Sequence, residues 1–337
     1  MTHRASPLSF GHYPTPVERV ASLSNEASEL WVKRDDLTHP VYGGNKVRKL
    51  EWLLAEAKDR GARRVVTVGA AGSHHVLATT YFGKQNGLDV EAVLVPQPRT
   101  EHVAEVLRAD LALGLRVFPV GSWGAAPFAL AKRIKAGGRF VTVGGSSVTG
   151  SMGYVAAARE LAAQVRAGEL PEPDVCVVAL GSGGTAGGLA AGFAVEGLRT
   201  RVVGVCVSVP PWVLRLASLW LARSCARRAG LRATVASVRA GGTLTMDTRF
   251  LGAGYGHPTP EGEQAARLAL EHARLTLDPT YTAKAFASAL WHVRARRAPH
   301  VLYWHTLSSA PMDRLLSAAR TLSDDQIDER LRALALG

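Results

Sequence analysis

The chain has 337 residues, 47% of them hydrophobic, with a formal net charge of +12 and a pI near 10.0. This length and hydrophobic content are sufficient for a buried core, and the usual size of domains favours two of them. The excess positive charge is scattered, and the arginine clusters at 223–228 and 294–297 are not interleaved with aromatic residues. A nucleic-acid partner is therefore not expected.

The sequence predicts neither a membrane span nor an export signal. The most apolar stretch, residues 207–222, is interrupted by Arg215 and two prolines, so a buried helix is expected there. The N-terminus lacks the apolar core of a secretion signal, and the three cysteines have no paired or metal-ligand spacing. We expect a reduced, cytoplasmic protein without a bound metal or a membrane partner.

Short apolar runs rich in β-branched residues alternate with amphipathic segments along the chain. The runs predict strands at residues 30–33, 65–68, 92–95, 116–120, 140–143, 175–180, 202–207 and 301–304. The amphipathic segments predict helices at residues 51–60, 100–113, 150–167, 261–274 and 282–296. This alternation is typical of an α/β fold in which helices cover sheets rich in parallel strands.

Two domains are expected, a small one at residues 49–159 and a large one formed by residues 1–48 and 160–337. Turn residues gather at 167–174, between a predicted helix and a predicted strand, and make that stretch a candidate linker.

A glycine-rich segment, Gly181-Ser-Gly-Gly-Thr-Ala-Gly-Gly188, stands between a predicted strand and a predicted helix. Backbone N–H groups and the helix dipole at such a turn favour an anion such as phosphate. A P-loop is excluded because the segment has no lysine. A dinucleotide site remains an alternative, although the next strand ends without the acidic residue that would bind ribose. A turn without a ligand is the other alternative.

Lys46 follows Gly43-Gly44-Asn45 at the start of a predicted helix, in a chain with only 8 lysines. A partly desolvated lysine at a helix N-terminus is expected to have a depressed pKa, which a Schiff-base amine requires. Lys49, one turn later, is expected to be an ordinary exposed lysine. Taken alone, Lys46 could also be structural.

Two further segments carry candidate polar groups. Ser73, His74 and His75 lie between a strand and a helix, where backbone donors and these side chains would suit a carboxylate. The adjacent histidines lack a third ligand for a metal. Tyr255 lies between glycines and is expected to be exposed, so it is a candidate acid or base, with an ordinary loop tyrosine as the alternative.

Together these segments resemble the fold-type II pyridoxal-phosphate enzymes, and most closely the D-cysteine desulfhydrase and 1-aminocyclopropane-1-carboxylate (ACC) deaminase family. The resemblance covers nearly the whole chain. Besides the segments above, it is carried by Tyr13-Pro-Thr-Pro16, Lys33-Arg-Asp-Asp-Leu37 and the Asp-Pro-Thr-Tyr run ending at Tyr281.

The resemblance implies a role for each matching residue. Lys46 is expected to hold pyridoxal 5′-phosphate as a Schiff base and to shuttle the Cα proton, while Ser73, His74 and His75 face the substrate carboxylate. The tyrosines Tyr255 and Tyr281 are expected to approach the substrate from the other side of the ring. The expected cofactor contacts are Asn45, His74, Ser182, Gly183, Gly184, Thr185, Gly187 and Thr306, of which Thr306 lies near the pyridine nitrogen.

The implied activity is α,β-elimination or deamination of a small amino acid by a cytoplasmic homodimer. Thr282 replaces the glutamate of ACC deaminases, which favours D-cysteine as substrate, giving pyruvate, sulfide and ammonia. His74 replaces an asparagine that contacts the cofactor in the family pattern. ACC deamination and L-cysteate sulfo-lyase activity are the alternatives within the family. A protein that binds the cofactor but has lost turnover is the alternative of another class.

Overall fold

A computed structural model of the protein describes residues 6–97, 101–208, 210–232, 243–311, 313, 315 and 317. These residues form two compact units. The six-stranded unit consists of Phe10–Lys49 and Ser146–Ala310, and the four-stranded unit consists of residues 6–9, Leu50–Gly145 and the described residues after 310. The expected boundary at residue 160 falls inside a helix, Val148–Arg166, and the candidate linker at 167–174 joins two elements of the six-stranded unit.

The sheet of the six-stranded unit is parallel except at one edge. The first strand is antiparallel to its neighbour, and every other neighbouring pair is parallel. In spatial order the strands are β1 (Val17–Arg19), β2 (Glu29–Arg34), β10 (His300–His305), β7 (Val175–Leu180), β8 (Arg201–Cys206) and β9 (Leu244–Asp247). Its short 3-10 turns are Ala21–Leu23 and Asp35–Leu37.

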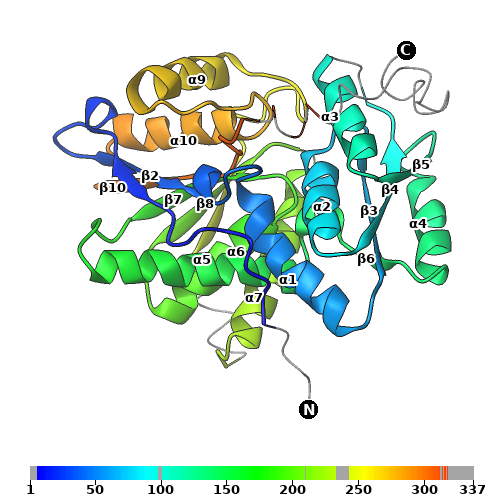
Figure 1. Ribbon diagram of the computed structural model, residues 1–337. Coiled ribbons are helices and arrows are strands. Elements are labelled where there is room, and N and C mark those ends of the chain that lie inside the picture. Colours follow the sequence, from blue (N-terminus) through cyan, green and yellow to red (C-terminus); the bar gives the residue numbers. More distant parts are fainter. Residues whose placement is uncertain are drawn as a thin grey trace. The chain divides into compact units, whose positions relative to one another are not determined.

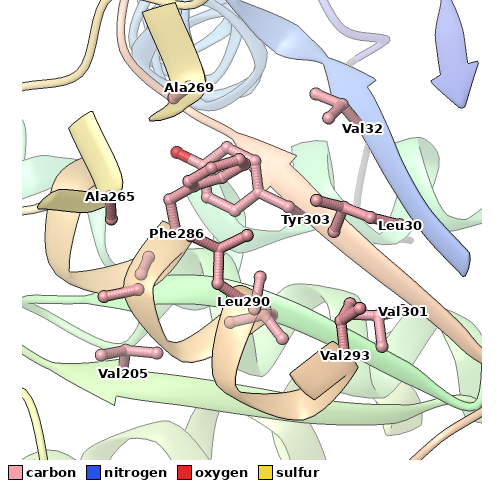
Figure 2. Packing of buried hydrophobic residues seen from close by; sticks show 14 of the residues in the cluster. Leu30, Val32, Val205, Ala265, Ala269, Phe286, Leu290, Val293, Val301 and Tyr303 are labelled. Carbon is pink, nitrogen blue, oxygen red and sulfur yellow. The ribbon is translucent and has the colours of Figure 1, made fainter. Parts of the chain in front are cut away.

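Helices cover both faces of this sheet (Figure 1). On one face lie α5 (Val148–Arg166), α6 (Gly184–Glu196) and α7 (Pro211–Arg228), and on the other lie α9 (Pro260–Ala273) and α10 (Thr282–Arg294). Phe286, Leu290 and Val293 of α10 point into an apolar core against side chains of the strands (Figure 2). This packing holds α10 firmly on the sheet, because apolar surface removed from water is the main stabilising term of a core.

The four-stranded unit has an all-parallel sheet, in the order β5 (Arg116–Pro119), β4 (Asp89–Val95), β3 (Arg64–Ala70) and β6 (Arg139–Phe140). Its helices are α2 (His74–Gln85), α3 (Glu101–Ala112) and α4 (Ala126–Lys135), and Val143–Gly145 forms a 3-10 turn. The helix α1 (Asn45–Asp59) begins in the six-stranded unit and continues into this one.

The predicted α/β class is confirmed, and each of the eight predicted runs overlaps a strand. The run at 140–143 is shorter than expected, because the chain turns at Gly144, which has a φ of 62°. The strands β1 and β9 and the helix α4 were not predicted. No helix in the described part of the chain is long and apolar enough to span a bilayer.

The apolar stretch at 207–222 was expected to form a buried helix, but only one face of the helix is buried. Its residues enter α7, which buries one face that includes Leu221 and Ala222. The opposite face exposes 66% of Trp212, 57% of Leu216 and 58% of Trp220. Both faces of this helix carry apolar residues, so the sequence could not show which face packs against the rest of the protein and which stays exposed.

Candidate active site

The loop before α1 is attached to the chain that follows β10. Gly43 N donates to Ser308 Oγ at 2.8 Å, and Asn45 N donates to the Thr306 carbonyl at 3.1 Å. Gly44 has a φ of 87°, and a Cβ atom there would lie 2.5 Å from the Thr306 oxygen. Glycine is needed at this position for both its conformation and its close approach. The structure thus brings Lys46 and Thr306 into one region of the six-stranded unit.

Lys46 occupies the first turn of α1 and is partly buried. Its Nζ donates to Asn45 Oδ1 at 2.8 Å, and Asn45 Nδ2 lies 3.4 Å from Thr185 Oγ1 in the glycine-rich segment. Burial lowers the pKa of the Lys46 amine to about 8, while the negative charge of Asp278 opposes the shift. The sequence predicted this direction. Lys46 therefore lies beside the glycine-rich segment with an amine that is substantially neutral near pH 8.

The glycine-rich segment forms the tight turn that enters α6. Gly183 is the N-cap, with a φ of 87°, and the helix begins at Gly184. Ser146 supports the turn, since its Oγ accepts from Gly184 N at 3.2 Å and lies 2.7 Å from Ser182 Oγ. The N-terminus of a buried glycine-rich helix suits an anion.

Gly187 plays a different part from the expected one within this segment. Its N–H donates to the Gly183 carbonyl, because Gly187 already lies in the helical ladder. A Cβ at Gly187 would lie 2.8 Å from the Ser218 carbonyl of α7. Gly187 thus permits close packing of α6 on α7, and its amide is used inside the helix.

Lys49 corrects a second expectation, because it is only 2% exposed. It follows Lys46 by three residues on the same helix, and residues at this spacing share a face. Burial and the nearby charge of Lys46 hold the pKa of Lys49 well below its ordinary value. Two lysines buried on one face of α1 are costly when both are charged, and an anion bound beside them would offset that cost.

Tyr255 and Tyr281, which are 26 residues apart in the chain, meet in the structure. Their hydroxyl oxygens are 3.1 Å apart, and their rings pack edge to face with centroids 5.7 Å apart. Tyr255 is 56% exposed, as its glycine context predicted. The ring of Tyr281 covers Gly181, since a Cβ on that glycine would lie 2.7 Å from Tyr281 Cε1. The tyrosine pair therefore adjoins the glycine-rich segment.

Asp278 organises the start of α10. Its carboxylate accepts from Tyr281 N at 2.7 Å, from Thr282 N at 3.1 Å and from Thr282 Oγ1 at 2.7 Å. A carboxylate at a helix N-terminus satisfies free backbone donors and complements the helix dipole. Thr282, which replaces the glutamate of ACC deaminases, is thus buried and directs its hydroxyl to Asp278. The sequence identified Thr282 but not the carboxylate that binds it.

Ser73, His74 and His75 belong to the four-stranded unit. Ser73 caps α2 through Val76 N, and His74 begins the helix. His75 is buried, with Nε2 at 3.0 Å from Thr67 Oγ1 on β3. The His75 ring thus packs inside this unit, and it is the N-terminal turn of α2, with Ser73 and His74, that offers donors to an anion.

A cavity of about 260 Å³ lies elsewhere in the six-stranded unit, and none of the predicted site residues lines it. Its walls include Arg201, Asp247, Arg249 and His292. Among the described residues, no group of three or more histidine, cysteine or acidic side chains has an arrangement that could hold a metal ion.

The chain was compared with protein families and with known proteins. Residues 8–306 match the family model described as pyridoxal-phosphate dependent enzyme. A D-cysteine desulfhydrase of Salmonella typhimurium strain LT2 is 33% identical over 314 residues, which cover 89% of this chain and 93% of the relative. A nocardicin C-9' epimerase of Nocardia uniformis subsp. tsuyamanensis is 36% identical over 305 residues, covering 88% and 90%.

Among solved structures, the crystal structure of an ACC deaminase homologue superimposes with a TM-score of 0.78 at 30% sequence identity. The match covers 93% of this chain and 96% of that one. The fold, the family model and relatives above 30% identity over most of their lengths agree. The chain therefore belongs to the pyridoxal-phosphate dependent enzymes and, within them, to the fold-type II group that includes D-cysteine desulfhydrases and ACC deaminases.

Proposed function

We propose that the protein is a lyase that eliminates the β-substituent of a small amino acid, with D-cysteine as the leading substrate and pyruvate, sulfide and ammonia as products. The observation that carries this proposal is the position of Lys46. Its amine has a pKa near 8 and is linked through Asn45 to Thr185 of the glycine-rich segment. A nucleophilic lysine beside a phosphate-type site is the arrangement that pyridoxal phosphate requires.

The six-stranded unit has the donors to hold this cofactor. Lys46 would bind its aldehyde carbon, the N-terminus of α6 with Ser182 and Thr185 would bind its phosphate, and Thr306 would lie near its pyridine nitrogen. Asn45 is a further contact. When bound, the cofactor withdraws electrons from the Cα atom of the substrate.

The protein's own groups would then position the substrate and move its protons. We assign the substrate carboxylate to the N-terminus of α2, with Ser73, His74 and the backbone of His75. His74 is also a candidate contact of the cofactor ring. The amine of Lys46 takes the Cα proton, and the hydroxyls of Tyr255 and Tyr281 approach the substrate as proton donors or acceptors.

Thr282 supports elimination over opening of the ACC ring. Its side chain is neutral, buried and bound to Asp278, so a charged partner for that ring is absent from this position. The test is release of keto acid from D-cysteine, L-cysteate, β-chloroalanine and ACC, measured side by side. Pyruvate and sulfide from D-cysteine support the proposal, and 2-oxobutyrate from ACC overturns the substrate choice. Visible cofactor absorbance with neither keto acid nor exchange of the Cα proton indicates a binding protein.

Epimerisation is a second candidate, favoured by the 36% identity with a nocardicin C-9' epimerase. It shares the first proton transfer with elimination but returns the proton to the opposite face. Incubation of single enantiomers in deuterated water separates the two. Deuterium at Cα with loss of optical purity and no keto acid would identify an epimerase.

The pKa of Lys46 predicts how cofactor attachment depends on pH. Only the neutral amine attacks an aldehyde, so the rate of attachment to cofactor-free protein should rise about tenfold per pH unit below pH 8 and level off above it. Stopped-flow absorbance checks this. Asp278→Asn should move the midpoint to lower pH, since its charge raises the pKa of Lys46. A midpoint near 10.5, the ordinary value for lysine, would contradict the assignment.

We propose a homodimer in which α7 packs against α7 of a second copy. Three exposed apolar residues, Trp212, Leu216 and Trp220, follow one another at intervals of four residues along α7. The stripe that they form is symmetric about Leu216, with a tryptophan on either side. An antiparallel two-fold contact would therefore place Leu216 on Leu216 and each Trp212 on the partner's Trp220. A stripe this apolar is typical of a contact surface.

Trp220→Asp should weaken this dimer at least 100-fold, because the two-fold symmetry places a buried charge in the apolar contact twice, once against each Trp212. Sedimentation velocity measures the change. Phe128→Asp is the matched control, since Phe128 is an aromatic residue with 81% exposure on α4 of the other unit. The surface assignment fails if both variants sediment as the parent does.

Three buried free cysteines support the expectation of a reducing, cytoplasmic setting.

A further inference from the structure

A buried lysine, Lys284, connects the two tyrosines of the site. It lies in the first turn of α10 and has no exposed surface. Its ammonium donates to the Leu251 carbonyl at 2.9 Å and to the Gly254 carbonyl at 3.0 Å. Both acceptors belong to the loop that carries Tyr255. A buried lysine without such acceptors would be strongly destabilising, so these contacts are a defined part of the fold.

The loop at 251–257 is rich in glycine. Gly252, Gly254 and Gly256 all have positive φ values, of 59°, 109° and 80°. Glycine loses more conformational freedom on folding than any other residue, and a segment with three of them is costly to order. In the described part of the chain, the N–H groups of this loop donate to carbonyls of the same turn, such as Gly254 N to the Leu251 carbonyl at 3.1 Å.

The other end of the connection is rigid. Asp278 caps the helix at Tyr281 and Thr282, and Phe286 and Leu290 anchor it in the core (Figure 2). Tyr281 is thus fixed by α10 itself. Tyr255 meets it at 3.1 Å with the loop in the position that the ammonium of Lys284 contacts.

We infer that Lys284 is a positioning residue, which clamps the glycine loop to α10 and so keeps the hydroxyl of Tyr255 on that of Tyr281 in the substrate region. This inference rests on the proposed function, since it assigns the tyrosine pair to the substrate. Lys284 itself takes no proton from the substrate. Removal from water lowers its pKa, while the charge of Asp278 opposes that shift, so raising the pH should loosen the clamp.

Lys284→Met tests the clamp in the full-length enzyme, because methionine keeps the apolar stem and removes the donors. Hydrogen exchange followed by mass spectrometry should show at least tenfold faster exchange at 251–257, with the helix at 286–294 unchanged. With the cofactor bound, we expect kcat to fall about 10- to 100-fold and KM to change less than threefold, as a misplaced group predicts. Lys58→Met, which removes an exposed lysine that donates to a carbonyl, should alter neither.

Two further variants separate positioning from damage to the fold. Tyr255→Phe combined with Lys284→Met should be no slower than Tyr255→Phe alone if Lys284 acts through that hydroxyl. Lys284→Gln keeps an amide donor and should retain part of the exchange protection, and it serves as the test if the methionine variant does not fold.

Unchanged exchange at 251–257 in the folded variants, or additive losses of kcat, would overturn the inference. A Tyr255→Phe variant with full activity but a loop that loosens in Lys284→Met would overturn the role of the tyrosine and leave the clamp standing.

Discussion

Lys46→Ala should abolish the visible absorbance of the protein-linked cofactor and reduce kcat/KM for the substrate at least about 1,000-fold, since covalent attachment and proton transfer are both assigned to this amine. The absorbance of purified protein and a coupled assay for keto acid measure the two effects. Reduction of the parent protein with borohydride, followed by peptide mass spectrometry, should place the pyridoxyl group on Lys46.

The matched control is Lys58→Ala, which removes an exposed lysine from the same helix. It should keep both the absorbance and the activity. Lys49 is the informative rival, because it is buried on the same face. Label on Lys49, or absorbance that survives in Lys46→Ala, would reassign the attachment site and with it the centre of the proposed mechanism.

Most strands could be predicted because their own residues form a run that is apolar and rich in β-branched side chains. The runs that became β7 and β8 are continuously apolar, as strands buried on both faces must be. The strands β1 and β9, of three and four residues, are too short for such a signal and form through pairing with β2 and β8. Pairing between segments far apart in the sequence is a tertiary property, so the edges of the sheet were missed.

The candidate site divides in the same way. The glycines of the 181–188 segment and the loop before Lys46 could be found because turns impose their own residue choice. Lys49 was misjudged because helical spacing gives the face but not its burial. Asp278 belongs to the Asp-Pro-Thr-Tyr run, but its bonds to Tyr281 and Thr282 were not predicted. Lys284 carries no local signal, because its role depends on α10 meeting a loop some 30 residues earlier, which only the folded chain shows.

A buried cluster of charged side chains lies next to the first turn of α1 and consists of Lys33, Asp35, Arg48 and Glu160. From the sequence, two of them were noted only as part of the Lys-Arg-Asp-Asp run. Arg48 donates to Asp35 at 2.7 Å and to Glu160 of α5 at 2.9 Å, and Lys33 donates to Glu160 at 2.6 Å. Burial would raise the pKa of Asp35, but the charge and hydrogen bonds of Arg48 and the charge of Lys33 hold it below its ordinary value. The cluster joins β2, α1 and α5 within two residues of Lys46.

Arg48→Met should lower the free energy of unfolding by about 3–5 kcal/mol, because it leaves two carboxylates buried with Lys33 as their remaining cation. Urea titration followed by circular dichroism measures this change. Arg159→Met is the control. Arg159 lies on α5 next to Glu160 and pairs with Glu196 of α6, but its side chain is 65% exposed. The loss of unfolding free energy in this variant should therefore be at most about 1 kcal/mol. Equal losses in the two variants would show that burial adds nothing to the Arg48 contacts.

The sign of the pH dependence separates lost charge pairing from lost packing in Arg48→Met. In the parent, the lowered pKa values of Asp35 and Glu160 contribute stability above the ordinary carboxyl range, and this is lost as the pH falls through the folded-state values. Without Arg48, desolvation dominates at Asp35 and its pKa rises, so acidification should relieve the variant. The gap in stability between parent and variant should therefore narrow from pH 7 toward pH 4. A constant gap would mean that the contact of Arg48 with Tyr13, whose ring centroid lies 4.2 Å from the guanidinium carbon, matters more than its pairing with the carboxylates.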